Sequence, residues 1–243
     1  MPPSLHSLNC AFRVFCFGVK MEIIENKAMK LMLRRPERVT AVIPKSKVIG
    51  EPVPGIHEVL VHFGLEEAQV LKNLSIKGVR SPIAFKYNWS GMRTPFEHQR
   101  ETAEFLTLHK RCYLFSEQGT GKTSSVAWAA DYLLNINQIK RILVICPVSI
   151  MRSAWVADLF KCCMHRTVAV AHGTREQRRQ AINSGAEFVI INYDGVATVE
   201  EELKDKFDLI VLDEANYIKT ATTRRWKSIN SLVNANTWLW LMT

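Results

Sequence analysis

Residues 116–123, which read SEQGTGKT, constrain the fold of this chain more than any other segment. They stand between a short apolar run, CYLF at 112–115, and a helical pattern, SSVAWAADYLL, that begins at residue 124. A glycine-rich loop that binds phosphate needs this order of strand, loop and helix, whereas an ordinary glycine turn does not. The segment therefore predicts an α/β fold with a phosphate-binding loop.

The residue types of the loop suit a nucleoside triphosphate. Gly119 and Gly121 let the backbone curl so that successive N–H groups and the start of the next helix face the β-phosphate. Lys122 would bring a positive charge to the β- and γ-phosphates, and the Thr123 hydroxyl would ligate Mg²⁺. We expect ATP and Mg²⁺ as cofactors, with the rest of the site formed by Ser116, Glu117, Gln118 and Thr120. Ser116 departs from the full motif, which has glycine there.

A second informative segment is FDLIVLDE at 207–214, which ends in the acidic pair Asp213 and Glu214, about ninety residues after the loop. Two carboxylates at the end of a buried apolar strand are costly unless they bind something. Beside a phosphate loop, Asp213 is expected to hold Mg²⁺ and Glu214 to orient the attacking water. The expected catalytic residues are Lys122 and this pair. The alternative for the pair is a solvated strand end that opens a loop.

The second half of the chain alternates short apolar runs with longer amphipathic segments. The runs are CYLF, RILVIC, TVAVA, FVIIN, LIVLD and WLWLM. Runs that are apolar throughout fit strands buried on both faces, so we expect a mostly parallel sheet covered by helices. Ligands gather at the carboxyl ends of such strands, which would bring the phosphate loop, CPVS, INYD and DEAN to one edge.

The first half has a different organisation. Residues 1–20 differ in composition from the rest of the chain, which indicates a leader or a mis-called start. Residues 21–80 contain short alternating segments, KLMLRR, RVTAVIP and HEVLVHF, and a helical pattern in LEEAQVLKNL, so we expect a small accessory α+β region. Residues 81–95, with two prolines and a glycine, are expected to be a linker. The ATP-binding lobe would occupy residues 96–243.

With these motifs assembled, the chain resembles the first RecA-like lobe of superfamily-two helicases, and more closely Swi/Snf-type translocases, especially versions found in tailed bacteriophages. The resemblance is carried, in order, by TPFEHQRETAEFL, SEQGTGKT, RILVICPVSIMRSAW, FVIINYDGV and FDLIVLDEANYIK. It implies a DNA-stimulated ATP hydrolase that moves along a DNA backbone without sequence preference.

The resemblance also assigns residues outside the loop and the acidic pair. Gln99 looks like the glutamine that reads the adenine edge, unless it is a surface residue at a helix start. The family's DNA-contacting segments place Ser149, Arg152, Asn192 and Tyr193 against phosphates, through side chains or main-chain N–H groups. The aromatic residues Trp155 and Tyr193 would equally suit the core. The charged run at Arg175, Arg178 and Arg179 is expected to be a solvated helix face.

Two departures from the family pattern affect the expected function. Asn216 stands where many relatives have a histidine that couples the nucleotide site to the next motif, which puts the coupling in doubt. Thr243 matches the first residue of that next motif, so the chain is expected to be truncated and to need a second lobe, which brings the arginine finger. We therefore expect this chain alone to be nearly inactive. The alternatives are the motor of a restriction or repair enzyme and a non-catalytic ATP- or DNA-binding module.

Charge and composition bear on partners and compartment. The formal net charge of +9 suits a polyanionic partner or a soluble surface. No apolar run is long enough to span a membrane, and the six cysteines lack zinc-ligand spacing. We expect a cytoplasmic protein without a membrane partner, located in the host cytoplasm if phage-encoded.

Overall fold

The computed structural model describes residues 21–89 and 91–243, so the expected leader at 1–20 lies outside the described residues. The chain divides into two compact units. The first contains the described residues up to His62 and Val70–Val79, and the second contains the described residues of Phe63–Gln69 and Arg80–Thr243. Helix α2 (Leu65–Asn73) contributes residues to both units.

The first unit is built on an antiparallel sheet of four strands in the order β1-β2-β4-β3. The strands are β1 (Met21–Ile24), β2 (Ala28–Leu33), β3 (Lys47–Val53) and β4 (Ile56–His62). Alternate residues of β2 and β4 are buried, including Met29, Leu31, Val59 and Val61. Their period of two residues is what half-buried strands require.

Some of the strands and helices expected for this unit are present and others are not. HEVLVHF and LEEAQVLKNL form β4 and α2 as predicted. RVTAVIP does not form a strand, because Pro36 starts the short helix α1 (Glu37–Thr40), which buries Val39. Pro54 and Gly55 connect β3 to β4, and Gly55 has φ of 76°, as the third position of a type II turn demands.

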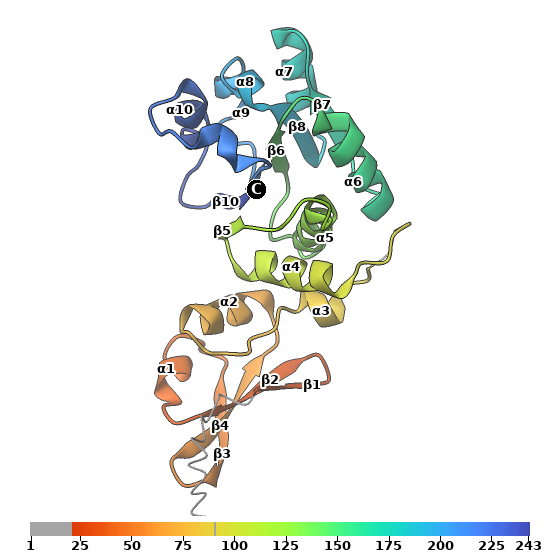
Figure 1. The fold of residues 1–243 in the computed structure, drawn as a ribbon. Helices are drawn as coiled ribbons and strands as arrows, with labels where there is room; N and C mark the ends of the chain where they lie inside the picture. The colour runs from red at the N-terminus through yellow and green to blue at the C-terminus, as the bar shows by residue number, and fades with distance from the viewer. Residues whose placement is uncertain (1–20, 90) are drawn as a thin grey trace, which may run out of the picture. The chain divides into compact units, whose positions relative to one another are not determined.

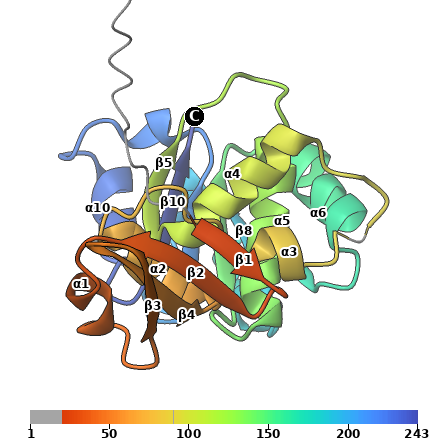
Figure 2. The same cartoon turned by 90° about the horizontal axis from the view of Figure 1, so that it is seen from below.

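The second unit contains a parallel sheet of six strands in the order β5-β10-β9-β6-β8-β7. Strands β6, β7 and β8 of this sheet are labelled in Figure 1. All six predicted runs are its strands, namely β5 (Arg111–Leu114), β6 (Ile142–Cys146), β7 (Val168–Ala171), β8 (Phe188–Asn192), β9 (Leu209–Leu212) and β10 (Trp238–Met242). Figure 2 shows β10 lying beside β5, although these two strands are the last and the first of the sheet in sequence order. The prediction of a mostly parallel sheet is confirmed.

Helices cover both faces of this sheet because successive residues of its strands point in opposite directions. Ile142 and Val144 pack on one face with α3 (Ile83–Lys86), α4 (Glu97–Leu108), α5 (Lys122–Asn135) and α6 (Ala157–Cys162). Leu143 and Ile145 pack on the other face with α7 (Arg175–Asn183), α8 (Tyr193–Val196), α9 (Glu200–Leu203) and α10 (Arg224–Asn230).

Two segments differ from simple expectation. The segment SIMRSAWVADLF is not one α-helix, because η1 (Met151–Val156) is a π-helical turn that leads into α6. Such widened turns are frequent at functional sites. Residues 81–95, expected as a linker, contain α3 and pack Tyr87 and Trp89 partly buried against the core. None of the helices in the described residues is long and apolar enough to cross a membrane.

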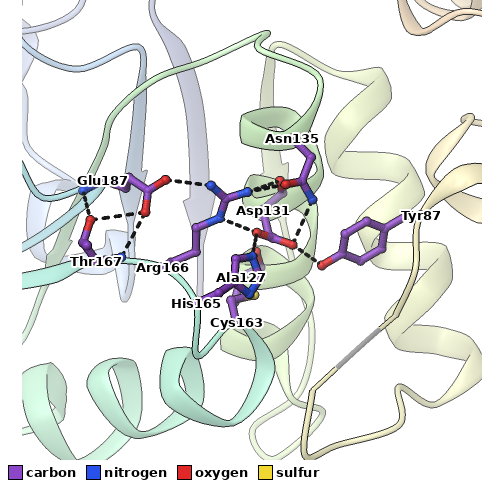
Figure 3. A network of polar contacts seen from close by, with 9 residues as sticks. All are labelled: Tyr87, Ala127, Asp131, Asn135, Cys163, His165, Arg166, Thr167 and Glu187. Carbon is purple, nitrogen blue, oxygen red and sulfur yellow. Dashed lines mark hydrogen bonds and ion pairs between the residues drawn. The ribbon is translucent and has the colours of Figure 1, made fainter.

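A buried polar network fixes α5 to the loop before β7 (Figure 3). Asp131 of α5 is only 2% exposed, and its carboxylate accepts hydrogen bonds from the Nε of Arg166 at 2.5 Å and the hydroxyl of Tyr87 at 2.5 Å. Arg166 also donates to Glu187 at 2.6 Å, and His165 lies 2.9 Å from Asp131. Because the buried charge has these partners, its desolvation is compensated. The network holds the helix that begins at the phosphate loop.

Candidate nucleotide site

The phosphate loop joins β5 to α5 in the conformation that its glycines permit. Gly119 and Gly121 have φ of 80° and 77°, in the left-handed region that favours glycine. A Cβ at Gly121 would also lie 2.1 Å from the Nε2 of Gln99, so a side chain there would displace the end of that amide. Helix α5 begins at Lys122 without a side-chain cap from the described residues, which leaves its first N–H groups for a ligand.

The side chain of Lys122, near the end of the phosphate loop, reaches back to the start of the loop. Its ammonium donates to the carbonyl oxygens of Ser116 at 2.7 Å and Glu117 at 3.2 Å. The loop borders a pocket of about 360 Å³ lined by His98, Thr102, Ser116, Glu117, Thr120, Lys122 and Ser125. Both carbonyl partners are exchangeable, so this ammonium is placed to bind phosphate oxygens instead.

Gln99 of α4 is buried against the loop and is 8% exposed. Its Nε2 donates to the carbonyl of Thr120 at 3.1 Å, and its Oε1 accepts from the backbone N–H of Phe96 at 3.1 Å. The Nε2 of His98 lies 3.0 Å from the same carbonyl oxygen of Thr120. Gln99 is therefore not a freely solvated surface side chain, and it links the start of α4 to the phosphate loop.

The acidic pair follows β9 at the carboxyl edge of the sheet. Asp213 is 7% exposed, and its Oδ2 accepts from the indole Nε1 of Trp155 at 2.8 Å. Burial raises the pKa of the Asp213 carboxyl, and the charge of Glu214 adds to this, whereas the Trp155 N–H and the positive charge of Lys122 act in the opposite direction. Asp213 follows β9 and the phosphate loop follows β5, so the loop and the acidic pair stand at the same edge of the sheet.

Glu214 has a backbone conformation unusual for its residue type. Its φ is 57° and its ψ is 56°, in the left-handed region, just before the 3₁₀ turn η2 (Ala215–Ile218). Such residues occur where the surrounding structure enforces them, and they gather at active sites. Its side chain is partly exposed beside a buried carboxylate, which suits contact with water at the sheet edge.

The four predicted DNA-contacting residues lie in different environments. Ser149 and Arg152 are exposed, the first just before η1 and the second within it. Asn192 and Tyr193 are 7% and 3% exposed, and the Tyr193 hydroxyl donates to the carbonyl of Asp213 at 2.8 Å. Asn192 and Tyr193 are thus part of the interior.

One expectation about the basic residues is wrong. Arg178 does not belong to a solvated helix face, because its guanidinium is buried and donates to the carbonyls of Ala171 at 2.7 Å and Gly173 at 3.1 Å. Arg175 and Arg179 are exposed as predicted. No sequence pattern distinguishes Arg178 from its neighbours, since all three arginines lie within one polar helix.

Asn216, which departs from the family pattern, contacts the residue after β10. Its Nδ2 donates to the Thr243 hydroxyl at 2.8 Å. The asparagine therefore forms a direct bond between the segment after the acidic pair and Thr243. Trp155 was not expected in the site at all, because an apolar tryptophan pattern carries no information about which polar group its indole N–H will reach.

The donors and acceptors at this edge fit Mg²⁺ and a nucleoside triphosphate. The uncapped start of α5, the ammonium of Lys122 and the glycine-permitted curve of the loop suit phosphate oxygens. The buried carboxylate of Asp213 and the hydroxyl of Thr123 are hard oxygen ligands, which Mg²⁺ prefers.

Comparison with known proteins gives a consistent result. A family model described as "Type III restriction enzyme, res subunit" matches residues 86–242. The chain is 25% identical over 174 residues to the uncharacterized ATP-dependent helicase YqhH of Bacillus subtilis, an alignment that covers 68% of this chain and 29% of that protein. It is 26% identical over 156 residues to the DNA excision repair protein ERCC-6-like of Danio rerio, covering 58% of this chain and 11% of the relative.

A solved structure has a similar fold. The Sulfolobus solfataricus SWI2/SNF2 ATPase core in complex with dsDNA superposes with a TM-score of 0.56 at 22% identity, over 63% of this chain and 32% of that one. The similarity confirms the RecA-like fold. In all three comparisons the chain spans less than a third of the other protein.

Proposed function

This chain belongs to the family of the type III restriction enzyme res subunit, and on that premise we propose that its parallel-sheet unit binds and hydrolyses ATP to drive movement along DNA. The observation that carries the proposal is that the phosphate loop with Lys122 follows β5 and that Asp213 follows β9, so both stand at the carboxyl edge of one parallel sheet. The relatives confirm the resemblance to the first lobe of Swi/Snf-type helicases.

Each site residue has a proposed role in that reaction. The N–H groups of residues 116–123 and the ammonium of Lys122 would hold the β- and γ-phosphates. Thr123 and Asp213 would ligate Mg²⁺, which neutralises charge on the phosphate oxygens. Glu214 would orient the attacking water and accept its proton. These assignments are those suggested by the sequence, and the burial of Asp213 at the sheet edge supports them.

Gln99 is proposed to read the adenine edge from its present position. A glutamine amide has two N–H donors and two acceptor lone pairs. The bonds to Thr120 and Phe96 use one of each, so one donor and one acceptor remain for a base. The same side chain would then link the base to the phosphate loop.

Duplex DNA is the proposed track. Ser149 and Arg152 are exposed and would contact phosphates through a hydroxyl and a guanidinium, whereas Asn192 and Tyr193, which the sequence also suggested, are buried. The net charge of +9 supports a polyanionic partner. The motor of a restriction or repair enzyme would use the same residues, so that alternative differs in appended activities and not in this site.

The complete motor is proposed to need a second lobe that supplies an arginine finger. Such a residue typically contributes about 10³- to 10⁵-fold in rate. We therefore expect the 243-residue chain to bind ATP but to hydrolyse it barely above background, with or without DNA. The accessory region at 21–80, the linker at 81–95 and the lobe at 96–243 remain the proposed division of the chain.

The test is binding of a fluorescent ATP analogue to the wild type, Lys122→Ala and a matched variant, Lys140→Ala. Lys140 is exposed and precedes β6, so it stands at the end of the strand that is remote from the site. Its replacement should leave the affinity for the ATP analogue unchanged. Lys122→Ala should abolish binding. Equal affinity in all three proteins would refute the proposal. Phosphate release with and without duplex DNA then tests turnover, which Glu214→Gln should abolish in a chain extended by the second lobe.

A further inference from the structure

Trp155 connects the segment after β6 to the acidic pair across 58 residues of sequence. It is fully buried, and the only polar atom of its side chain, Nε1, donates to the Oδ2 of Asp213 at 2.8 Å. An indole N–H is a donor with no acceptor capacity, so its bond depends on the orientation of the ring. The ring is fixed in turn by the surrounding core of Leu159 and Met151.

This bond has more consequence than a surface hydrogen bond. A carboxylate removed from water needs donors to remain charged, and a charge-assisted bond is about twice as strong as a neutral one. Because Oδ2 faces Trp155, the direction of the Asp213 carboxyl plane is set by the position of η1. The backbone N–H of Glu214 also bonds this carboxylate, and the lone pairs that remain are left for a ligand at the sheet edge.

The main chain of Asp213 is held as well. Its N–H donates to the carbonyl of Ile145 at 2.9 Å, and its carbonyl accepts from the Tyr193 hydroxyl at 2.8 Å. The Tyr193 ring stacks on Tyr217 with centroids 5.1 Å apart and planes at 10°. Tyr193 directly follows β8, as Trp155 belongs to the segment that follows β6. Two segments at the carboxyl edge therefore converge on one acidic residue.

We propose that Trp155 is a positioning residue for Asp213, so that the conformation of the Ser149–Trp155 segment and the binding of Mg²⁺–nucleotide depend on each other. The inference rests on the proposed function, since it takes Asp213 as a metal ligand. Coupling of this kind is reciprocal, so whatever displaces η1 weakens metal binding, and metal binding restrains η1. The exposed residues Ser149 and Arg152 belong to the same segment.

The chain provides a matched control in Trp128. Both indoles are buried in the same core cluster, at 0% and 1% exposure, but Nε1 of Trp128 has no hydrogen-bond partner among the described residues. Trp155→Phe and Trp128→Phe remove similar volumes from the interior. Only the first removes a donor from Asp213.

The experiment measures the affinity of a fluorescent ATP analogue with Mg²⁺ and with EDTA in wild type and both variants. In Trp155→Phe the affinity with EDTA should stay near that of the wild type, and the gain on adding Mg²⁺ should fall by about 10- to 100-fold or disappear, as for other groups that orient metal ligands. Trp128→Phe should keep the full gain. Trp155→Phe and Trp128→Phe with equal gains would overturn the inference.

The same data separate this inference from the function on which it rests. If the wild type binds the analogue equally with Mg²⁺ and with EDTA, the role of Asp213 in metal binding fails and the inference fails with it. If the wild type gains affinity with Mg²⁺ but Trp155→Phe retains that gain, only the role of Trp155 is refuted.

A measurement on the wild type covers the case in which Trp155→Phe does not fold. In the ¹⁵N-labelled protein, the indole N–H resonance of Trp155 should shift when Mg²⁺ is added to the nucleotide complex, because the metal changes the charge on its acceptor. The indole N–H resonance of Trp128 should not shift. A Trp155 resonance that is unchanged by Mg²⁺ would overturn the inference.

Discussion

The guanidinium of Arg178 donates to the side-chain oxygen of Asn192 at 2.9 Å, which fixes the last residue of β8 to helix α7. The same nitrogen donates to the carbonyl of Ala171 at the end of β7. One arginine thus joins the ends of two neighbouring strands, immediately before Tyr193. The arrangement of strand ends at the carboxyl edge thus depends on an arginine that was not expected to bind ATP, Mg²⁺ or DNA.

Arg178→Ala should therefore lower the free energy of unfolding by about 1.5–3 kcal/mol, because charge-assisted bonds are lost and buried acceptors are left without a donor. Arg179→Ala is the matched control on the next position of the same helix. Arg179 is exposed and makes surface ion pairs with Glu176 and Glu202, so its replacement should change stability by under about 1 kcal/mol. Urea unfolding of both variants is the measurement, and similar losses would contradict the structural role of Arg178.

Gly121→Ala and Gly119→Ala should differ although both glycines have positive φ. Each alanine is placed in the left-handed region at a cost of about 1–2 kcal/mol. Only the new methyl group at 121 meets Gln99, so it should push that amide off the Thr120 carbonyl and cost about 0.5–1.5 kcal/mol more. In a Gln99→Ala background the two substitutions should become equal. A difference that persists there, in urea unfolding, would show that Gln99 is not the cause.

Stability should fall at acid pH partly through Glu187. Burial opposes ionisation of this carboxylate, but the Thr167 N–H and the Arg166 guanidinium outweigh it and hold the pKa of Glu187 below its ordinary value. Because the folded pKa is the lower one, the contribution is complete above the unfolded pKa and is lost as pH falls through the folded pKa. Glu187→Gln should flatten the dependence of unfolding free energy on pH in this range. Glu176→Gln, at an exposed position of α7, should leave it unchanged; an unaltered profile in Glu187→Gln would refute the assignment.

Arg152→Ala should weaken non-specific DNA binding and reduce the slope of log affinity against log salt by about one, because one phosphate contact fewer releases one counterion fewer. The comparison variant is Lys140→Ala, which removes the same charge at the opposite end of β6. Fluorescence anisotropy with duplexes of unrelated sequence, over a range of salt concentrations, gives both slopes. Equal slopes would exclude Arg152 from the DNA-contacting surface.

The parallel sheet was predictable because each of its strands can be recognised from its own residues. Runs such as Phe188–Asn192 are apolar throughout, as burial on both faces requires. Strand β3 (Lys47–Val53) has no such run, since nearly all its residues are exposed at the edge of its sheet, and it was not expected. Its hydrogen bonds to β4 depend on a partner strand and not on its own composition.

In the site too, features set by consecutive residues were predictable, whereas contacts between residues distant in the sequence were not. The phosphate loop is encoded in eight consecutive residues, and so it could be placed from the sequence alone. The contact of Trp155 with Asp213 and the burial of Arg178 arise only when strands that are distant in the sequence become neighbours. A single sequence contains no periodicity or spacing that reports such contacts.

The left-handed backbone of Glu214 means that stability and the proposed reaction favour different residues at this position. Conformational preference alone would select glycine there, since a side chain in this region carries a penalty of order 1–3 kcal/mol. A screen of random variants that selects only for heat resistance should therefore enrich Glu214→Gly, while a screen for turnover, made in a chain extended by the second lobe, should reject it. The more robust protein would be the one that has lost the carboxylate proposed to orient the attacking water.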